Sequence, residues 1–182
     1  MRRVIGVRGV SGAGKSHLVR QIMSLYSKKE EERASGRRFP VGYWLSESAA
    51  NLDPLFVPGF YGSNRQDDAQ GVLWDTKELH DLVIAAHRAG WACLFETRSR
   101  NDGWERPVRY FSPDVFVPVI INHPIDQAIQ TTRDLGGKIM LETARRHWKR
   151  ITQSATEIAS LGYEVLIADR QSCLRHVREM LV

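Results

Sequence analysis

One stretch near the start of the chain combines the residue types and the spacing that hold a triphosphate. The run Gly9-Val10-Ser11-Gly12-Ala13-Gly14-Lys15-Ser16 matches the pattern G-x-x-x-x-G-K-[ST] of the phosphate-binding P-loop. In this pattern the glycines let the backbone curl so that its N–H groups point at phosphate oxygens. Lys15 would reach the β- and γ-phosphates, and the hydroxyl of Ser16 would bind Mg²⁺. The predicted contacts to ATP are Gly9, Ser11, Gly12, Ala13, Gly14, Lys15, Ser16 and His17.

The residues on either side of this run predict the structure that a P-loop requires. Residues 4–7 have the composition of a buried strand. After the run, apolar residues repeat with helical period, which predicts a helix from Lys15 to about Ser27. The N-terminus of that helix would add partial positive charge facing the phosphates. A strand, a glycine-rich turn and a helix in this order predict nucleotide binding and leave the reaction open.

Glu96 and Arg98 are the next residues that could act on bound phosphates. Glu96 ends the apolar run from Trp91 to Phe95, where P-loop proteins place an acidic residue that orients the Mg²⁺ shell. A glutamate here, rather than an aspartate, favours contact with the ion through water. Arg98 follows two residues later, and this Glu-x-Arg spacing resembles the pair in deoxynucleoside kinases, whose arginine meets phosphoryl charge. We therefore expect Ser16 and Glu96 at the metal and Arg98 in catalysis.

Three carboxylates compete for the role of general base. A kinase that acts on an alcohol needs one carboxylate within hydrogen-bond reach of that hydroxyl. Asp67 and Asp68 lie in a long polar loop, and Asp68 is preferred. The run from Gly59 to Asp68 resembles a stretch of polynucleotide 5′-hydroxyl kinases in which the catalytic aspartate follows an Asn-Arg pair. Glu47, at the end of a predicted strand, is the competing candidate.

Two adjacent glycines predict a lid. Gly136 and Gly137 interrupt a helical pattern, which indicates a short helical lid over residues 131–146. In P-loop kinases a mobile lid delivers arginines to the phosphates and closes over the nucleotide. Arg133 is the lid arginine that we expect to contact the nucleotide and to act in catalysis. Arg170, which follows the last predicted strand, would lie beside the adenine.

The chain carries an excess of positive charge. Its 26 Lys and Arg residues outnumber its 21 Asp and Glu residues, which gives a net charge of +5 and a pI of about 9.5. A mononucleotide enzyme needs only a local positive pocket, so the excess favours a polyanionic partner such as DNA. Basic and aromatic residues also interleave in a way that suits single-stranded or flipped bases. These are Arg37, Arg38, Phe39, Trp44, Tyr61, Arg65 and Trp104, of which Arg37, Arg38, Tyr61 and Arg65 are the predicted substrate contacts.

Strand and helix patterns alternate along the chain. They predict a single three-layer α/β domain over residues 1–182, a P-loop NTPase of kinase-like type with a mainly parallel central sheet. Right-handed crossovers place a ligand at the carboxyl ends of parallel strands. We therefore expect the P-loop, Glu47, Glu96, His123 and Asp169 near that edge.

Some local expectations are more specific. Residues 41–45 and 55–57 should pair as a hairpin, whereas residues 28–38, which lack an apolar face, should form a solvated helix end and a loop. Residues 101–113 are expected to be a polar loop. Pro118 in a buried strand predicts a bulge or an edge position.

The sequence also indicates a compartment. No apolar run is long enough to span a membrane, and residues 1–3 lead directly into the first strand, which is not the pattern of a signal peptide. Cys93 and Cys173 lie in apolar contexts without metal-ligand spacing. They are predicted to be reduced core thiols, as is usual in a cytoplasmic protein without a membrane partner.

Five segments, taken in chain order, carry a resemblance to a known group. They are residues 8–16, residues 36–43 (GRRFPVGY), residues 57–61 (VPGFY), residues 94–96 (LFE) and the arginine-bearing lid. They resemble the phage P-loop kinases proposed to act in thymine hypermodification, the 5-hydroxymethyluridine DNA kinases. The resemblance spans most of the chain. It implies ATP-dependent phosphorylation of the hydroxymethyl group of the base within DNA, in the cytoplasm of a phage host.

The loop after Tyr61 departs from this resemblance. Residues 64–68 stand where that group has a Cys- and Gly-rich patch with an aspartate. Other functions therefore stay open at this point. They are a nucleoside or nucleotide kinase, a polynucleotide 5′-hydroxyl kinase, and a P-loop binding protein with negligible transfer.

Overall fold

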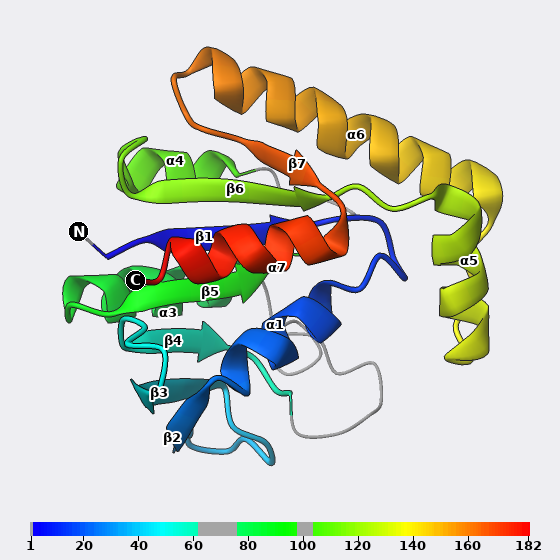
Figure 1. Cartoon of the computed structure of the whole chain (residues 1–182). Helices are drawn as coiled ribbons and strands as arrows, with labels where there is room; N and C mark the ends of the chain where they lie inside the picture. The colour runs from blue at the N-terminus through cyan, green and yellow to red at the C-terminus, as the bar shows by residue number, and fades with distance from the viewer. Residues whose placement is uncertain (1, 62–75, 98–103) are drawn as a thin grey trace.

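The computed structural model describes residues 2–61, 76–97 and 104–182 of the chain. Within these residues, seven strands form one sheet in the order β2-β3-β4-β5-β1-β6-β7 (Figure 1). Five of them, β4, β5, β1, β6 and β7, run parallel, whereas β3 is antiparallel to both β2 and β4. The prediction of an α/β fold with a mainly parallel sheet is confirmed. The strands are β1 Val4–Arg8, β2 Tyr26–Glu32, β3 Gly42–Ser48, β4 Leu55–Pro58, β5 Ala92–Glu96, β6 Phe116–Ile121 and β7 Leu166–Ala168.

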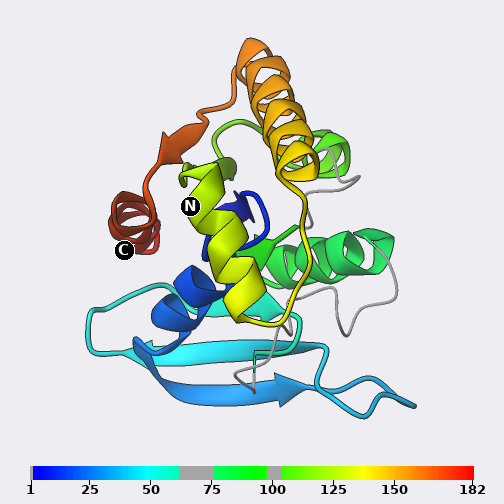
Figure 2. The same cartoon turned by 90° about the vertical axis from the view of Figure 1, so that its right-hand side faces the viewer.

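Helices cover both faces of the sheet. α1 and α7 lie on one face, and α3, α4 and α6 lie on the other (Figures 1 and 2). α5 stands in front of the edge at which the parallel strands end, as Figure 2 shows. This arrangement is compatible with a kinase-like fold. The described helices are α1 Lys15–Met23, α3 Thr76–Arg88, α4 Glu105–Tyr110, α5 Ile125–Asp134, α6 Leu141–Ser160 and α7 Arg170–Glu179.

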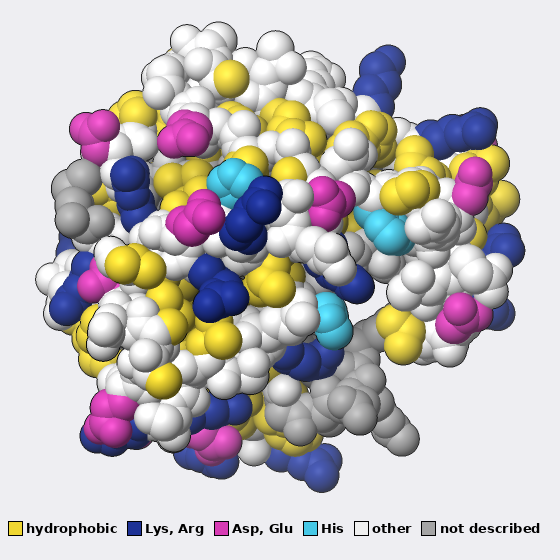
Figure 3. All heavy atoms as spheres, viewed as in Figure 1, with side chains coloured by type: hydrophobic (Ala, Val, Ile, Leu, Met, Phe, Trp, Pro, Cys, Tyr) yellow, Lys and Arg dark blue, Asp and Glu magenta, His cyan; other side chains and the backbone are white. Residues whose placement is uncertain are grey.

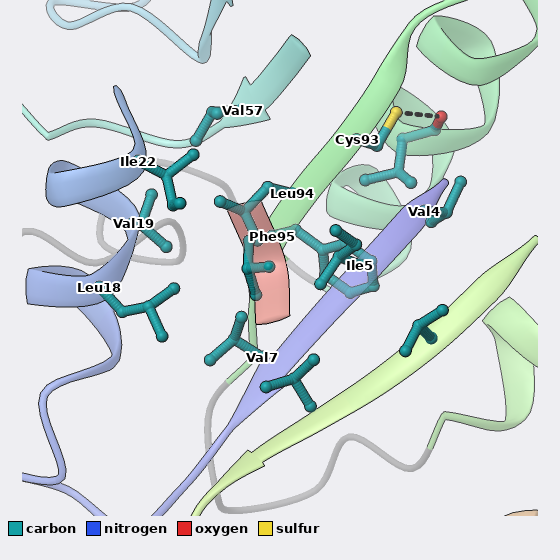
Figure 4. Packing of buried hydrophobic residues seen from close by; sticks show 14 of the residues in the cluster. Val4, Ile5, Val7, Leu18, Val19, Ile22, Val57, Cys93, Leu94 and Phe95 are labelled. Carbon is teal, nitrogen blue, oxygen red and sulfur yellow. Dashed lines mark hydrogen bonds between the residues drawn. The ribbon is translucent and has the colours of Figure 1, made fainter. Parts of the chain in front are cut away.

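The core between α1 and the sheet explains how the start of α1 is fixed. Leu18 and Ile22 are one turn apart on α1, so their side chains leave the same side of the helix. Both are fully buried, and Figure 4 shows them directed towards Val7 and Leu94 of the two central strands. Burying side chains of this size contributes about 1.5–3 kcal/mol each. The packing holds the first turn of α1 close to the ends of β1 and β5.

Strand direction defines two edges of the sheet. We call the edge at which the five parallel strands end the carboxyl edge, and the opposite one the amino edge. Gly42 pairs with Pro58 and Leu45 pairs with Leu55, so β3 begins at the carboxyl edge and ends at the amino edge. Because β2 is antiparallel to β3, the connection between them lies at the carboxyl edge. The predicted hairpin of residues 41–45 with 55–57 is confirmed by this register.

The segment after α1 differs from its prediction. α1 ends at Met23, and residues expected to be a helix end and a loop form β2 at the side of the sheet. β2 exposes most of its charged side chains, which is how edge strands avoid pairing with other chains. Its anchor is Tyr26, which is buried and donates a hydrogen bond of 2.7 Å to the carbonyl of Asp53. Backbone pairing with β3 therefore outweighs the poor strand propensity of a Lys- and Glu-rich run.

Two further local predictions are wrong. The region expected to be a polar loop contains α4, which begins directly after the fully buried Trp104. Pro118 lies in β6 between β1 and β7, so it is not at an edge, and its pairing with Gly6 continues the register of β6 with β1 without a bulge. Along a strand, the backbone groups of successive residues point alternately to the two neighbouring strands. The N–H of Asn122 bonds to the carbonyl of Ala168 in β7. The nitrogen of Pro118, an even number of residues earlier, therefore also points towards β7. Pairing with β7 begins only at Val119, and no N–H is needed at position 118.

The two cysteines are free and buried, in agreement with the prediction of core thiols. Burial raises the pKa of the Cys173 thiol to about 11 and raises the pKa of Cys93 as well. Among the described residues, no helix is long and apolar enough to cross a membrane.

Candidate functional site

The connection between β1 and α1 is shaped by two glycines in a left-handed conformation. Gly12 has φ 83° and Gly14 has φ 90°, a region that residues with a side chain rarely adopt. Gly14 also precedes the first residue of α1, and no side chain caps the N–H groups there. The Lys15 ammonium folds back over the loop and donates hydrogen bonds to the carbonyls of Gly9 (3.2 Å) and Val10 (3.3 Å). Uncapped N–H groups at the start of α1 and the Lys15 ammonium therefore lie together at the carboxyl edge.

A carboxylate and a hydroxyl meet beside this loop. The Ser16 hydroxyl lies 2.9 Å and 3.0 Å from the two carboxylate oxygens of Glu96. Glu96 is the last residue of β5, pairs with Val7 of β1 and is only 1% exposed. Because β1 and β5 are parallel neighbours that end together, the connection from β1 to α1, and with it Ser16 at the start of α1, lies beside the end of β5. The predicted juxtaposition of Ser16 and Glu96 is present in the structure.

α5 packs against the glycine-rich loop more tightly than any side chain would permit. A Cβ atom on Gly12 would lie 2.0 Å from the carbonyl oxygen of Ala128 and 2.7 Å from the hydroxyl of Thr132. That hydroxyl itself donates a hydrogen bond of 2.8 Å to the Ala128 carbonyl. The backbone of α5 is therefore in contact with the loop, and position 12 is restricted to glycine by space as well as by φ.

Replacing Gly12 with alanine should destabilise the protein by about 3 kcal/mol, because a steric clash is added to the cost of a left-handed residue. The matched control is Gly162→Ala, since Gly162 has φ 89° and nothing within 4 Å of an added Cβ. The control should lose only about 1 kcal/mol. Urea unfolding of both variants measures the difference. Equal losses would show that α5 does not press on the loop.

Positive charge gathers at the α1 end of the loop. A Cβ on Gly14 would meet the Cδ atom of Arg170 at 2.9 Å, so the Arg170 side chain lies across the loop. Partial burial, followed by the charges of Arg170 and Arg20, lowers the pKa of His17. An anion bound here would meet several cationic groups. Arg170 therefore lies against the glycine-rich loop, whereas its predicted contact with the adenine stays a prediction.

The start of α7, which positions Arg170, is fixed by a side-chain cap. Asp169 accepts hydrogen bonds from the N–H groups of Gln171 (2.9 Å) and Ser172 (3.1 Å) and from the Ser172 hydroxyl (2.7 Å). The hydroxyl bond is the largest of the causes that lower the pKa of Asp169 below 3.8, followed by the backbone bonds. A carboxylate with a lowered pKa stabilises the folded protein above its unfolded pKa, and this stabilisation is lost as the pH falls through the folded pKa.

We therefore expect the melting temperature of Asp169→Asn to fall less steeply with acid, below about pH 4, than that of the unchanged protein. Asparagine also caps helices well, so this variant should be nearly as stable as the unchanged protein at neutral pH. Asp169→Ala should be clearly less stable at neutral pH. Thermal unfolding over a pH series tests both statements, and parallel acid profiles for Asp169→Asn and the unchanged protein would contradict them.

The predicted lid region contains the expected helix break. α5 ends at Asp134, and the turn that follows is closed by bonds from the N–H groups of Gly136 to Arg133 (2.8 Å) and of Gly137 to Thr132 (2.9 Å). Arg133 lies in the last turn of α5 and is exposed. α5 contacts the loop through Ala128 and through Thr132, the residue directly before Arg133, so Arg133 belongs to the helix that covers the loop.

The predicted substrate residues divide into buried and exposed ones. The Arg37 side chain is 9% exposed and pairs with Glu78 of α3 at 2.6 Å and 2.9 Å. Tyr61 is 6% exposed and its N–H donates to the Tyr43 hydroxyl at 3.3 Å. Both residues therefore support the carboxyl edge, and the prediction that they offer a contact surface is corrected. Arg38 remains exposed.

Trp104 and Glu47 are also corrected. Trp104 is fully buried, with Arg8 above its ring at 4.9 Å, so it cannot stack on a base. Glu47 lies near the end of β3, and β3 ends at the amino edge because it is antiparallel to β4. It therefore lies at the edge of the sheet opposite to the glycine-rich loop, and it is not a candidate base. His123 and Asp169 follow β6 and β7 at the carboxyl edge, as predicted.

Several predicted residues lie outside the described residues. They are Arg65, Asp67, Asp68 and Arg98. Their assignments stay predictions.

Arg8, at the end of β1, is not among the predicted site residues. It is 4% exposed and donates a hydrogen bond of 3.4 Å to the Ser154 hydroxyl of α6, in addition to its contact with Trp104. This side chain joins the last residue before the loop to α6 and to the start of α4. A basic residue that ends an otherwise apolar strand was the available signal.

The surface charge is mixed on the face that α1 and α7 cover. Figure 3 shows basic side chains interspersed with acidic ones over this face, without a continuous basic stripe. The net charge of +5 is therefore not concentrated there.

Comparison with known proteins gives two findings. No protein-family model matches the chain. The chain is 24% identical over 192 residues to a protein named 5-hmdU DNA kinase from Pseudomonas phage PaMx11, and the match covers 99% of this chain and 97% of that protein. A similarity along the full length of both proteins indicates a distant relation to that kinase.

Proposed function

We propose that this protein is an ATP-dependent kinase that transfers the γ-phosphate to the hydroxymethyl group of 5-hydroxymethyluracil in DNA. The observation that carries the proposal is the group formed by the glycine-rich loop, Lys15 and the Ser16–Glu96 pair at the carboxyl edge. The full-length similarity to a 5-hmdU DNA kinase supports the choice of acceptor.

On the donor side, the loop would act as a P-loop. Its amides and the N-terminus of α1 would bind the β- and γ-phosphates of ATP. Lys15, which now bonds to the carbonyls of Gly9 and Val10, would turn to the phosphate oxygens. Ser16 and Glu96 would hold a Mg²⁺ ion, because a hydroxyl and a carboxylate are the hard oxygen ligands it prefers. When bound, such an ion neutralises charge on the phosphates.

The acceptor hydroxyl needs a base and the transferring group needs cations. We assign the base to Asp68, with Asp67 as the alternative, since both follow β4 in the chain and β4 ends at the carboxyl edge. Glu47 is excluded by its place at the amino edge. Arg133 and Arg98 would stabilise the charge on the transferring phosphoryl group, together with Lys15. Arg170 would lie over the nucleotide, beside Gly14.

Because the hydroxymethyl group projects from a base, the acceptor must reach the site unpaired. A kinase acting on it would take a single-stranded segment or a flipped base. An acceptor screen with γ-labelled ATP tests the proposal. We expect label in single-stranded DNA that contains 5-hydroxymethyluracil and none in the matching thymine DNA with a blocked 5′ end.

The screen also separates the second candidate function. The Asn64-Arg65 pair before Asp67 and Asp68 favours a polynucleotide 5′-hydroxyl kinase. That function predicts label on a 5′-hydroxyl oligonucleotide of ordinary bases. Label in free nucleosides alone would indicate a nucleoside kinase, and intact ATP with every acceptor would indicate a binding protein. Each of these three results would reject the proposal.

A further inference from the structure

The carboxyl edge carries a stacked aromatic pair, an exposed Phe39 on a partly buried Phe60, that lies outside the nucleotide loop. The Phe39 and Phe60 rings stack with their centroids 4.6 Å apart and 29° between their planes. Phe39 comes from the connection between β2 and β3, whereas Phe60 follows β4. Phe39 is 41% exposed, so part of its side chain is open to solvent. Arg38 places its guanidinium carbon 5.2 Å from the centre of the Phe39 ring.

The backbone that bears this pair is held in place. The N–H of Gly59 donates to the carbonyl of Val41 at 2.7 Å, and the N–H of Val41 donates to the carbonyl of Glu32 at 2.8 Å. The Arg37–Glu78 ion pair fastens the same connection to α3. A surface that is already ordered loses little conformational entropy when a ligand binds. The backbone that carries the exposed Phe39 ring is therefore already ordered before a ligand binds.

Its place relative to the glycine-rich loop suits an acceptor. β4 is separated from β1 by a single strand, β5, and neighbouring strands lie about 5 Å apart. β4, which Phe60 follows, therefore lies about 10 Å from β1, the strand that leads into the glycine-rich loop. This spacing is of the order of one nucleotide with its phosphate.

We propose that Phe39, backed by Phe60 and accompanied by Arg38, is a stacking platform for one unpaired nucleobase of the acceptor DNA. The inference rests on the proposed function and names the surface that takes the DNA. An aromatic face accepts any base, and an arginine beside it can stack or pair with the neighbouring phosphate. The same chemistry explains why Arg38 and Phe39 are adjacent and exposed. Arg37, in contrast, is paired with Glu78.

The test is a direct binding measurement with the full chain. A fluorescent single-stranded oligonucleotide containing 5-hydroxymethyluracil is titrated in the absence of ATP, and anisotropy gives the Kd. Phe39→Ala should weaken binding by about ten-fold or more, and Phe39→Trp should restore it, because stacking on one aromatic ring has this size. Phe39→Leu keeps an apolar contact with Phe60 but loses stacking, so it should behave like the alanine variant.

The matched control is Tyr110→Ala. Tyr110 is 51% exposed and also has an arginine beside its ring, Arg106 at 5.8 Å, but it ends α4, which precedes β6 at the amino edge. This variant should bind the oligonucleotide as the unchanged protein does. Arg38→Ala should reduce the dependence of the Kd on salt by about one ionic contact. An unchanged Kd for Phe39→Ala, or an equal loss for Tyr110→Ala, would overturn the platform.

Parallel phosphate transfer separates this inference from the proposed function. If the unchanged protein binds through Phe39 but transfers no phosphate to the oligonucleotide, the proposed function fails and the platform stands. If it transfers phosphate and Phe39→Ala keeps both Kd and KM for DNA, the platform fails and the function stands.

Discussion

Lys15→Ala should lower kcat for phosphate transfer by about a thousand-fold or more, with the fold intact. The Lys15 ammonium is the cationic side chain that bonds directly to the carbonyls of Gly9 and Val10 in the loop. In the transition state of phosphoryl transfer, charge spreads over the γ-phosphate oxygens, and a fixed cation stabilises that charge more than it stabilises ground-state ATP. Steady-state kinetics at saturating ATP and DNA measures the loss in kcat.

Lys149→Ala is the matched control for that variant. Lys149 is an exposed lysine of α6, and its removal changes the net charge by the same amount. Its kcat should equal that of the unchanged protein. Thermal unfolding of both variants verifies that the fold is kept. Near-normal turnover by Lys15→Ala would show that the glycine-rich loop is not the phosphate site.

Asp68→Asn should lower kcat by about 10²–10⁴-fold, because asparagine cannot accept the proton of the acceptor hydroxyl. Glu47→Gln should leave kcat unchanged, because the end of β3 lies at the amino edge, away from the loop. Asp67→Asn tests the neighbouring carboxylate and should have the smaller effect. The same transfer assay measures all three.

The pair of outcomes decides the assignment of the base. Loss of turnover in Glu47→Gln with normal turnover in Asp68→Asn would contradict both the assignment and the geometry from which Glu47 is excluded. Loss of turnover in Asp67→Asn alone would assign the role of general base to Asp67 instead of Asp68.

The part of the fold next to the loop could be predicted because its signals are local. An apolar strand, a glycine-rich run and an apolar helical stripe each lie within a few residues, and the structure has β1 and α1 there. β2 could not be predicted in this way. Its run of lysines and glutamates has no apolar face, and only pairing with the more distant β3 makes it a strand. α4 is only six residues long, too short for a helical period to stand out.

The site was predictable where chain direction was known and not elsewhere. Ser16 and Glu96 follow from the rule that parallel strands end together. Glu47 was misplaced because the reversal of direction in the predicted hairpin was not followed through to the end of β3, which lies at the amino edge. The Arg37–Glu78 pair and the Phe39–Phe60 stack join residues that are far apart or on separate segments. Neither contact leaves a pattern in the sequence, so an exposed Arg38 could not be distinguished from a buried Arg37.

In the proposed reaction, a phosphoryl group moves from ATP to the hydroxymethyl group of a base. The most direct test uses γ-labelled ATP and a single-stranded oligonucleotide that has one 5-hydroxymethyluracil and a 5′-phosphate. After the reaction the DNA is digested to nucleotides, and mass spectrometry locates the added phosphoryl group. We predict that it is found on the 5-hydroxymethyluracil nucleotide. A phosphoryl group on any other nucleotide, or none on the DNA while ATP is consumed, would contradict the proposed function.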